Sequence, residues 1–323
     1  MESAASFPTA KKLRVAVIGV GHLGQHHARI YAAMPRVELI GVADTDTARG
    51  KEIADKFNTR FFPDYRDLLP RVDAVSIAVP TSLHFQAALD ALSGNIDVLL
   101  EKPITSTLPE ADRLIAEAEQ KKAILQIGHL ERFNRAYLKV KNLIHQPLFI
   151  ENHRIGPFAS RGTDVNVILD LMIHDIDIIL SLTNSPLAEV RAKGIPVLSR
   201  QIDIVNARLE FESGCVANMT ASRVSLEKLR KIRIFQPECY ISLDYQNQQV
   251  TIARKANING QATIQVEHPE VEKEEPLKLE LHDFVGNCLN RTPPEISGKA
   301  GKEALGVAEI IARTALKHAS GST

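Results

Sequence analysis

Two patterns of hydrophobic positions divide the chain near residue 130. Before that point, short apolar runs rich in Val, Ile and Leu alternate with longer segments of helical periodicity. A continuous apolar run of this length is typical of a strand buried on both faces of a parallel sheet. The strands are expected at 13–20, 37–44, 72–79, 96–100 and 124–128. Strands that alternate with helices predict a doubly wound α/β domain over residues 13–130.

After residue 130 the rhythm changes. The pattern predicts a helix over 131–144 and a strand over 147–154, followed by runs of strand character separated by turn residues such as Ser213-Gly214. These runs lie at 190–197, 204–211, 215–222, 231–236, 240–243 and 250–253. They predict a second, α+β domain over 131–298 with an open, mostly antiparallel sheet. Helices are expected over 276–290 and 299–318, and residues 1–12 are expected to form a flexible leader.

One predicted helix carries an unusual polar stripe. Residues 164–183 are mostly Ile, Leu, Val and Met, so this helix should be buried nearly all round. In a regular α-helix Asp170, His174, Asp177 and Ser181 would share one face, whereas Asp175 would point elsewhere. Burying such groups costs several kcal/mol unless they are paired or face a wet cleft. The stripe is therefore either a satisfied pair inside the core or one wall of an active site.

A glycine motif lies between the first apolar run and the first helix. Gly19, Gly21 and Gly24 form a G-x-G-x-x-G pattern, and Asp44 follows Gly24 by 20 residues at the end of the second strand. Glycines in this context let the backbone approach a pyrophosphate, and the acidic residue takes the ribose hydroxyls. Asp44 and Asp46 would repel a 2′-phosphate, so the sequence favours NAD over NADP.

Composition excludes several classes of function. The chain has 39 basic and 39 acidic residues among 323, which gives no electrostatic support for binding nucleic acid or a membrane surface. Its three cysteines are widely spaced, and His22, His26 and His27 lack an Asp or Cys at ligand spacing, so no metal site is expected. No apolar run has the length and flanks of a signal peptide or membrane span, so a cytoplasmic protein is expected.

A family resemblance covers nearly the whole chain. The sequence carries GVGHLG near its start, VPTSLH and EKP after later strands, GHLERFN near residue 130 and DLMIHDID in the second domain. In order and spacing these motifs resemble the glucose-fructose oxidoreductase/inositol dehydrogenase/MocA (Gfo/Idh/MocA) family. The resemblance implies an N-terminal Rossmann domain and a C-terminal sheet that forms a homodimer or homotetramer. It also implies that the last helix, within 299–323, packs back toward the Rossmann domain.

The resemblance also implies roles for individual residues. Lys102 matches the lysine of the EKP motif, and Asp170 and His174 match an aspartate–histidine pair that meets the nicotinamide from the other domain. Lys102 would stabilise the developing alkoxide, and His174, oriented by Asp170, suits a general base. Which of Lys102 and His174 takes the proton first stays open. The remaining residues expected to contact the cofactor are His22, Leu23, Pro80, Thr81, His84 and Glu101.

The implied substrate is a sugar or nucleotide sugar. GHLERFN and the helix motif look most like the branch of UDP-N-acetylglucosamine 3-dehydrogenases, whose 3-keto product goes to a PLP-dependent aminotransferase in amino-sugar (lipid A type) biosynthesis. A diphosphate needs cations, for which Arg154 and Arg161 are candidates. Arg132, Asn134 and Asp177 are further candidates for contact with the substrate.

Three other functions stay open at this point. The first is a dehydrogenase of a free polyol or hexose such as inositol, which dependence on the UDP moiety would distinguish. The second is a non-catalytic NAD(H)-sensing protein, and the third is a reductase of an imine or a double bond. The combination of Lys102, Asp170 and His174 speaks against both of these.

Overall fold

The computed structural model describes residues 12–158, 165–258 and 261–317. Contacts within the chain define two compact units. Unit 1 comprises the residues up to Gly128 together with Glu280–Lys299, and unit 2 comprises His129–Leu279 and the residues from Ala300 onward.

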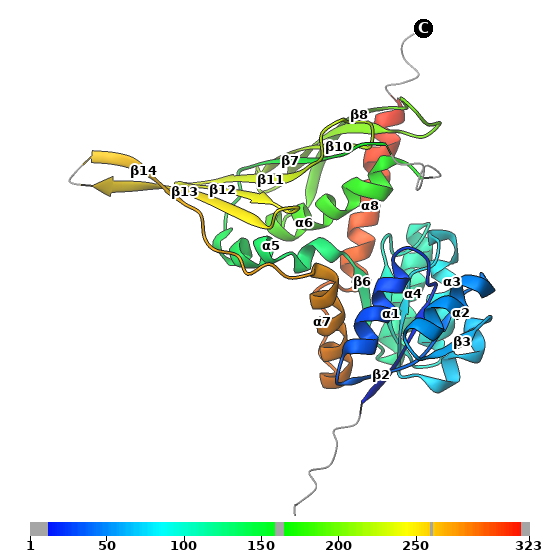
Figure 1. Ribbon diagram of the computed structural model, residues 1–323. Helices are drawn as coiled ribbons and strands as arrows, with labels where there is room; N and C mark the ends of the chain where they lie inside the picture. Colours follow the sequence, from blue (N-terminus) through cyan, green and yellow to red (C-terminus); the bar gives the residue numbers. More distant parts are fainter. Residues whose placement is uncertain (1–11, 159–164, 259–260, 318–323) are drawn as a thin grey trace, which may run out of the picture. The chain divides into compact units, whose positions relative to one another are not determined.

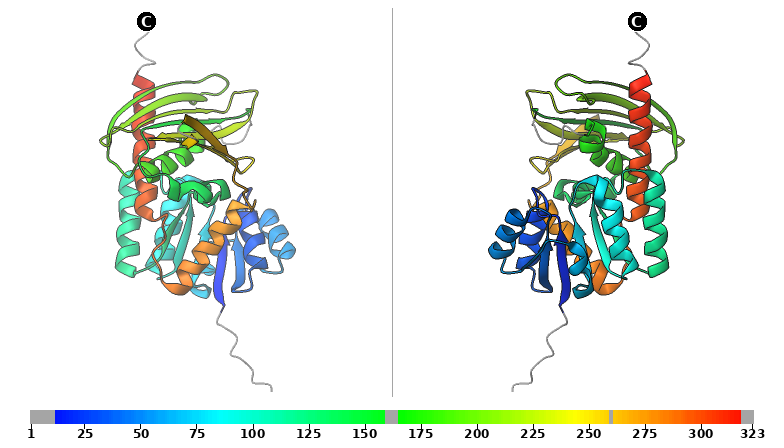
Figure 2. Two further views of the ribbon diagram at one scale, coloured as in Figure 1. Left: turned by 90° about the vertical axis from the view of Figure 1, so that its left-hand side faces the viewer. Right: turned by 90° about the vertical axis from the view of Figure 1, so that its right-hand side faces the viewer.

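The sheet of unit 1 has six parallel strands in the order β3-β2-β1-β4-β5-β6. This is the doubly wound arrangement expected from the sequence, in which ligands bind outside the carboxyl ends of the strands where the strand order reverses. Figure 2 shows the helices of this unit packed around the sheet. Its strands are β1 Leu13–Ile18, β2 Val37–Ala43, β3 Arg60–Phe62, β4 Ala74–Ile77, β5 Asp97–Glu101 and β6 Leu125–Gly128. Its helices are α1 Gly24–Ala33, α2 Thr47–Lys56, α3 Thr81–Ser93 and α4 Leu108–Lys121.

Unit 2 is built on an eight-stranded sheet in the order β14-β13-β12-β11-β7-β10-β9-β8. Only the β7–β10 pair of this sheet is parallel, which agrees with the expected mostly antiparallel sheet. Figure 1 shows the short helix α5 (Arg135–Val140) and α6 (Ile173–Thr183) along one face of the sheet. The strands are β7 Phe149–Ile155, β8 Leu187–Ile195, β9 Ile204–Phe211, β10 Val216–Ser222, β11 Leu229–Gln236, β12 Cys239–Asp244, β13 Gln249–Ile258 and β14 Gln261–Glu267.

The core of unit 2 lies between these helices and the inward side chains of the strands. Ile176 and Ile179 of α6 pack with Met219 and Ile234 of the sheet, and all four are fully buried. Burying a side chain of this size stabilises the folded state by roughly 1.5–3 kcal/mol. The apolar residues of the predicted helix therefore anchor it to the sheet and fix the positions of its polar residues.

The end of the chain is divided differently from the sequence expectation. Residues 280–298 were expected in the second domain, but α7 (Pro276–Asn290) and the segment after it join unit 1 from Glu280 on. The cause is bonding to that sheet, since Arg291 bonds to Asp97 and Ser297 bridges to Gln126. The last helix, α8 (Gly298–Lys317), belongs to unit 2 from Ala300 on, because Ala308 and other small apolar residues on it pack into the unit 2 core.

The predicted helix over 164–183 is not a regular α-helix. A π-helical turn over Ile168–Met172 precedes α6. A π turn brings residues five apart into line, so Asp170 and the residues after it do not follow the regular α-helical spacing on which the predicted stripe depends. The helix predicted over 131–144 is likewise interrupted, because the Asn134 side chain accepts a bond from the Ala136 N–H and caps a new helix, α5.

Two absences hold for residues 12–158, 165–258 and 261–317. Within these ranges, no helix is both long and apolar enough to cross a membrane. In the same part of the chain, no group of three or more His, Cys, Asp or Glu side chains is placed to hold a metal ion.

Candidate functional site

A cavity of about 590 Å³ lies at the carboxyl ends of β1, β2 and β4 in unit 1. Among the residues predicted to bind a cofactor, Gly19, Gly21, Asp44 and Pro80 line it. Tyr65 and Arg66, which sequence reasoning did not single out, also line this cavity. They follow β3, a strand too short and too weakly apolar to have been recognised from the sequence.

The three glycines of the motif have different steric environments. Gly19 has a φ of +84°, which other residues rarely adopt. A Cβ on Gly24 would lie 1.8 Å from the Gly19 carbonyl oxygen, so only glycine lets α1 start this close to the strand. A Cβ on Gly21 would have no atom within 4 Å, so this residue leaves open space at the cavity. No side chain caps the N-terminus of α1, which suits the binding of a pyrophosphate there.

Asp44 is held in place by backbone groups. One carboxylate oxygen accepts a bond from the Val20 N–H at 2.8 Å and the other accepts one from the Asp46 N–H at 2.9 Å. A carboxylate has about four acceptor sites, so Asp44 can also accept bonds from ribose hydroxyls. Asp46 instead caps α2 by accepting bonds from the Ala48 and Arg49 N–H groups. These residues fit a dinucleotide whose adenosine ribose carries no 2′-phosphate.

Three further residues predicted to contact the cofactor, His84, Glu101 and Lys102, lie in or beside the loop after β5. Lys102 is half-buried in this loop and forms a cis peptide with Pro103. His84 is buried, with its ring nitrogens 2.8 Å from the Pro103 carbonyl oxygen and 2.9 Å from that of Val79. Burial lowers the pKa of His84, so its ring is neutral near neutral pH.

Glu101 is also an interior residue. It lies 3.3 Å from the buried His27 and accepts a bond from the Lys102 N–H. His84 and Glu101 therefore hold the loop that carries Lys102, and their contact with the cofactor stays a prediction. Thr81 is the first residue of α3, and His22 is exposed beside Leu23 in the turn before α1. None of these three lines the cavity described above.

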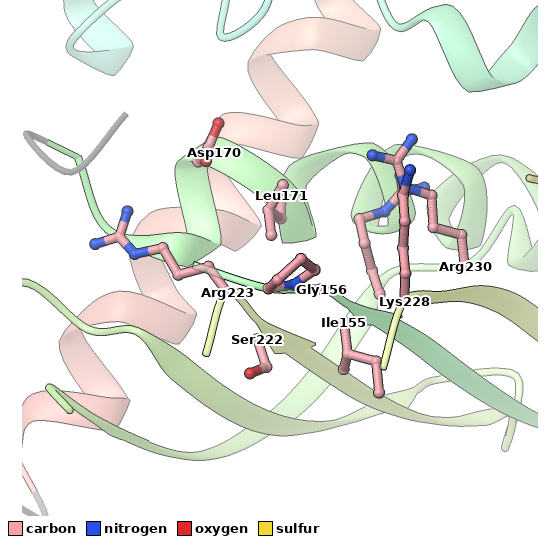
Figure 3. A pocket seen from close by; sticks show the side chains of 10 residues that line it. Ile155, Gly156, Asp170, Leu171, Ser222, Arg223, Lys228 and Arg230 are labelled. Carbon is pink, nitrogen blue, oxygen red and sulfur yellow. The ribbon is translucent and has the colours of Figure 1, made fainter. Parts of the chain in front are cut away.

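A second cavity, of about 490 Å³, lies within unit 2 (Figure 3). It lies where β7 and β10 end and β11 begins, and the π turn contributes Asp170 and Leu171. The sheet order explains this position, because β7 runs parallel to β10 and antiparallel to β11. His174 follows one turn after Asp170 and is half-buried, with its ring 6.3 Å from that of His129.

Arg154 lines this cavity, but its charge is neutralised inside the protein. Its guanidinium donates to both carboxylate oxygens of Asp175, at 2.7 and 2.8 Å, and to Glu131 at 2.9 Å. Burial lowers the pKa of Arg154, but the two carboxylates outweigh it and raise the pKa above its ordinary value. Arg154 thus joins α6 to the sheet, a structural role in place of the expected contact with a substrate.

Three other predicted substrate residues are also committed to interior bonds. Arg132 donates to Asp177 at 2.7 Å, and the Asp177 side chain is only 2% exposed. Asn134 is buried and donates to the Tyr245 carbonyl oxygen besides capping α5. The fifth candidate, Arg161, lies outside the described residues. Ser181 of the predicted stripe is a packing residue, which bonds to the Tyr137 hydroxyl and the Ile178 carbonyl oxygen.

Sequence reasoning missed the three other cations of this cavity. Arg223 is held by Asp203 at 2.8 Å, whereas Lys228 and Arg230 lie at the start of β11. The available signal was their spacing, because residues two apart at the start of a strand point to the same side. Nothing in the sequence indicated that this strand would lie beside β7.

Comparison with known families and proteins agrees with the two units. Residues 13–129 match a family model described as "Oxidoreductase family, NAD-binding Rossmann fold". Residues 145–241 match a model described as "GFO/IDH/MocA C-terminal domain". The chain is similar to UDP-N-acetylglucosamine 3-dehydrogenase from Acidithiobacillus ferrooxidans, with 38% identity over 300 residues, covering 92% of this chain and 95% of that protein.

A solved structure and one more relative extend the comparison. A solved structure of the Acidithiobacillus ferrooxidans UDP-N-acetylglucosamine 3-dehydrogenase superimposes with a TM-score of 0.89 at 36% identity, covering 94% of this chain and 97% of that one. A myo-inositol 2-dehydrogenase from Thermotoga maritima is 27% identical over 319 residues, covering 91% of this chain and 93% of that protein.

Proposed function

Because the chain belongs to the Gfo/Idh/MocA oxidoreductase family, an enzyme family with an NAD-binding domain, we propose that it oxidises the 3-hydroxyl of UDP-N-acetylglucosamine to a ketone. The observation that carries this proposal is the 38% identity to a UDP-N-acetylglucosamine 3-dehydrogenase over 92% of the chain. The cavity of unit 2, which combines a carboxylate with cations, supports a substrate that carries both hydroxyl and phosphate groups.

The proposed chemistry assigns one task to each catalytic side chain. NAD supplies the acceptor for the hydride that leaves the carbinol carbon. We propose that the Lys102 ammonium stabilises the alkoxide-like oxygen and that His174 accepts the hydroxyl proton. Asp170 orients His174 and stabilises its protonated form. These three assignments rest on the motif resemblance, and the half-buried positions of Lys102 and His174 are compatible with them.

The activity test compares nucleotide sugars with free sugars. The purified protein is supplied with NAD and UDP-N-acetylglucosamine, and NADH is measured. An added aminotransferase, with an amino acid as amine donor, consumes the ketone and pulls the uphill oxidation forward. We expect NADH with UDP-N-acetylglucosamine and none with free N-acetylglucosamine. Equal activity on the free sugar would refute the proposed substrate.

His174→Ala tests the proposed base. Removing a general base typically costs about 10²–10⁴-fold in rate, so kcat should fall by that factor while the affinity for NAD, measured by calorimetry, stays the same. The conservative control Asp170→Asn keeps the volume of the side chain but removes the charge, and it should lower kcat less. A His174→Ala variant with the kcat of the unchanged protein would refute the assignment.

A second candidate function is the oxidation of a free polyol. The similarity to a myo-inositol 2-dehydrogenase over 91% of the chain favours this alternative. Inositol carries no phosphate, so this function would leave the cationic side of the unit 2 cavity without a ligand. Turnover of myo-inositol with NAD, in the absence of UDP and of any nucleotide sugar, would establish it.

We also propose that unit 2 binds the substrate and forms the homo-oligomer, as a dimer or tetramer through the outer face of its sheet. Phe149, Phe235 and Tyr240 form a contiguous aromatic group on three neighbouring strands, which supports an interface there. The proposed ketone is a substrate for transamination, so a PLP-dependent aminotransferase of amino-sugar (lipid A type) biosynthesis is the proposed partner. Light scattering of the purified protein tests the oligomer, and a monomer at all concentrations would contradict it.

A further inference from the structure

Two cations, Lys228 and Arg230, lie at the start of β11 and line the cavity of unit 2. In the register of the sheet Arg230 lies directly opposite Arg154, and like charges in directly opposed positions repel each other. The two arginines differ in their partners. Arg154 is bound by Asp175 and Glu131, whereas the nearest carboxylate oxygen to the Arg230 guanidinium, on Glu131, is 4.0 Å away.

Arg230 can also be reached from the cavity. Its side chain is 41% exposed, compared with 4% for that of Arg154. Burial, and after it the charge of Arg154, lower the pKa of Arg230, and the nearby carboxylates of Glu131, Asp175 and Asp170 do not outweigh them. An anion bound in the cavity would compensate the charge of Arg230.

Lys228 adds a second cation at the right distance. It precedes Arg230 by two residues, so the two side chains leave the strand on the same side, about 7 Å apart along it. Figure 3 shows the charged ends of Lys228 and Arg230 directed the same way. Two neighbouring cations that line one cavity suit two linked phosphates better than a single carboxylate. Arg binds phosphate through a planar fork and Lys binds it as a point charge.

The other walls of the cavity have a different character. Asp170 contributes a carboxylate from the π turn, and Ile155 and Leu171 contribute apolar surface. A carboxylate accepts bonds from hydroxyl groups, so this cavity has a place for an uncharged sugar and a separate cationic place for an anion.

From this arrangement we infer that Arg230 and Lys228 form the diphosphate-binding subsite for a nucleotide-sugar substrate, with the sugar directed toward Asp170. The inference rests on the proposed function and adds the residues that make the enzyme specific for a diphosphate. It replaces the roles that the sequence assigned to Arg154, whose charge is already neutralised inside unit 2.

The test measures UDP binding and catalysis separately. Calorimetry with UDP alone should show binding to the unchanged protein that weakens as salt is added. Arg230→Gln, which keeps the length but removes the charge, should weaken UDP binding at least tenfold, and Lys228→Gln should weaken it less. The KM for UDP-N-acetylglucosamine should rise in the same proportion, with a smaller change in kcat. The affinity for NAD should stay the same.

Arg233→Gln is the matched control. Arg233 lies on the same strand but on the opposite face of the sheet, paired with Glu151 at 3.2 Å. This variant should bind UDP like the unchanged protein. Equal UDP affinities for Arg230→Gln and Arg233→Gln would overturn the inference, as would a lack of UDP binding by the unchanged protein.

The two proposals fail in different ways. If UDP-N-acetylglucosamine is oxidised but Arg230→Gln leaves the affinity for UDP unchanged, the diphosphate subsite is wrong and the proposed function stands. If UDP binds through Arg230 but UDP-N-acetylglucosamine is not oxidised, the subsite stands and the proposed reaction is wrong.

Discussion

The walls of the cavity in unit 1 are shaped mainly by backbone, whereas those of the cavity in unit 2 are shaped mainly by side chains. In unit 1, the walls depend on backbone: a glycine at positive φ, a glycine that admits a carbonyl oxygen and a helix N-terminus without a side-chain cap. In unit 2, the walls depend on side chains, because Asp170, Arg223 and Arg230 come from three separate elements. Backbone positions tolerate little variation, whereas side chains on a fixed sheet can change with the ligand. This difference explains how one nucleotide domain can serve relatives that act on different sugars and polyols.

The difference also appears in how each cavity is supported. The carboxylate of Asp44 is oriented by two backbone N–H groups close to it in the fold. The cations of unit 2 need charged partners instead, since Arg154 and Arg223 each depend on buried carboxylates. Removing one member of a buried ion pair leaves an uncompensated charge, so unit 2 should be the more sensitive to single changes of charge.

Arg154→Met should have the largest effect on stability. The change leaves the Asp175 and Glu131 carboxylates buried without their cation, and breaking a buried pair in this way costs about 3–5 kcal/mol. Urea unfolding of the full chain measures the loss. Arg233→Met is the control, because its partly exposed pair with Glu151 should contribute about 1 kcal/mol or less. Equal losses in the two variants would contradict the structural role of Arg154.

Gly24→Ala tests the backbone wall of unit 1. The added Cβ would overlap the Gly19 carbonyl oxygen, so we expect a loss of about 3 kcal/mol, at the upper end of the range for overpacking. NAD binding should be lost with it. The matched variant Gly21→Ala adds the same methyl group where no atom lies within 4 Å. It should therefore keep its stability in urea and bind NAD more weakly, and a Gly24→Ala protein as stable as Gly21→Ala would refute this account.

Acid unfolding of Asp203→Asn tests the smaller contribution to stability that Asp203 makes as the partner of Arg223 in the cavity of unit 2. Burial raises the pKa of Asp203, but bonds from the Ser199 hydroxyl, from backbone N–H groups and from Arg223 outweigh it and hold the pKa well below its usual range. A carboxylate with a lowered pKa stabilises the fold above its unfolded pKa of about 4, and this contribution is lost as the pH falls further. The variant should lose roughly 1–3 kcal/mol at neutral pH. Its deficit should shrink below about pH 4, and a constant deficit from pH 7 to pH 3 would contradict the expected sign.

Much of unit 1 could be predicted because its signals are local. The glycine motif, the first two apolar strands and Asp44 all lie within residues 13–44. The alternation of strands and helices predicted a doubly wound sheet, whereas the short strand β3 and the order of the strands came from the structure. At His84 and Glu101 the sequence showed polar residues near a ligand loop but could not show that they turn inward and support that loop.

Unit 2 was predictable as a class of fold but not as a site. Alternating apolar residues indicated an antiparallel sheet, and the polar residues of the predicted helix indicated either a buried pair or one wall of an active site. The regular spacing assumed for that helix was wrong over Ile168–Met172, because a π turn changes the rotation per residue and leaves no clear mark in the hydrophobic pattern. Arg154 and Arg230 have the same chemistry in the sequence, and only their partners in the folded chain distinguish a structural cation from one open to a ligand.

The sequence by itself determined the two kinds of sheet and the dinucleotide motif, because periodicity and spacing record local backbone geometry. Asp170 and His174 stood out as polar residues of an apolar helix, and the motif resemblance added Lys102 and the catalytic roles. The tertiary structure decided which charges are paired. Arg154 meets Asp175 across 21 residues of sequence, and Arg223 meets Asp203 across 20. Such pairings depend on strand register and on the rotation of one helix against a sheet. These are set by the packing of the whole core, so no short stretch of sequence contains them.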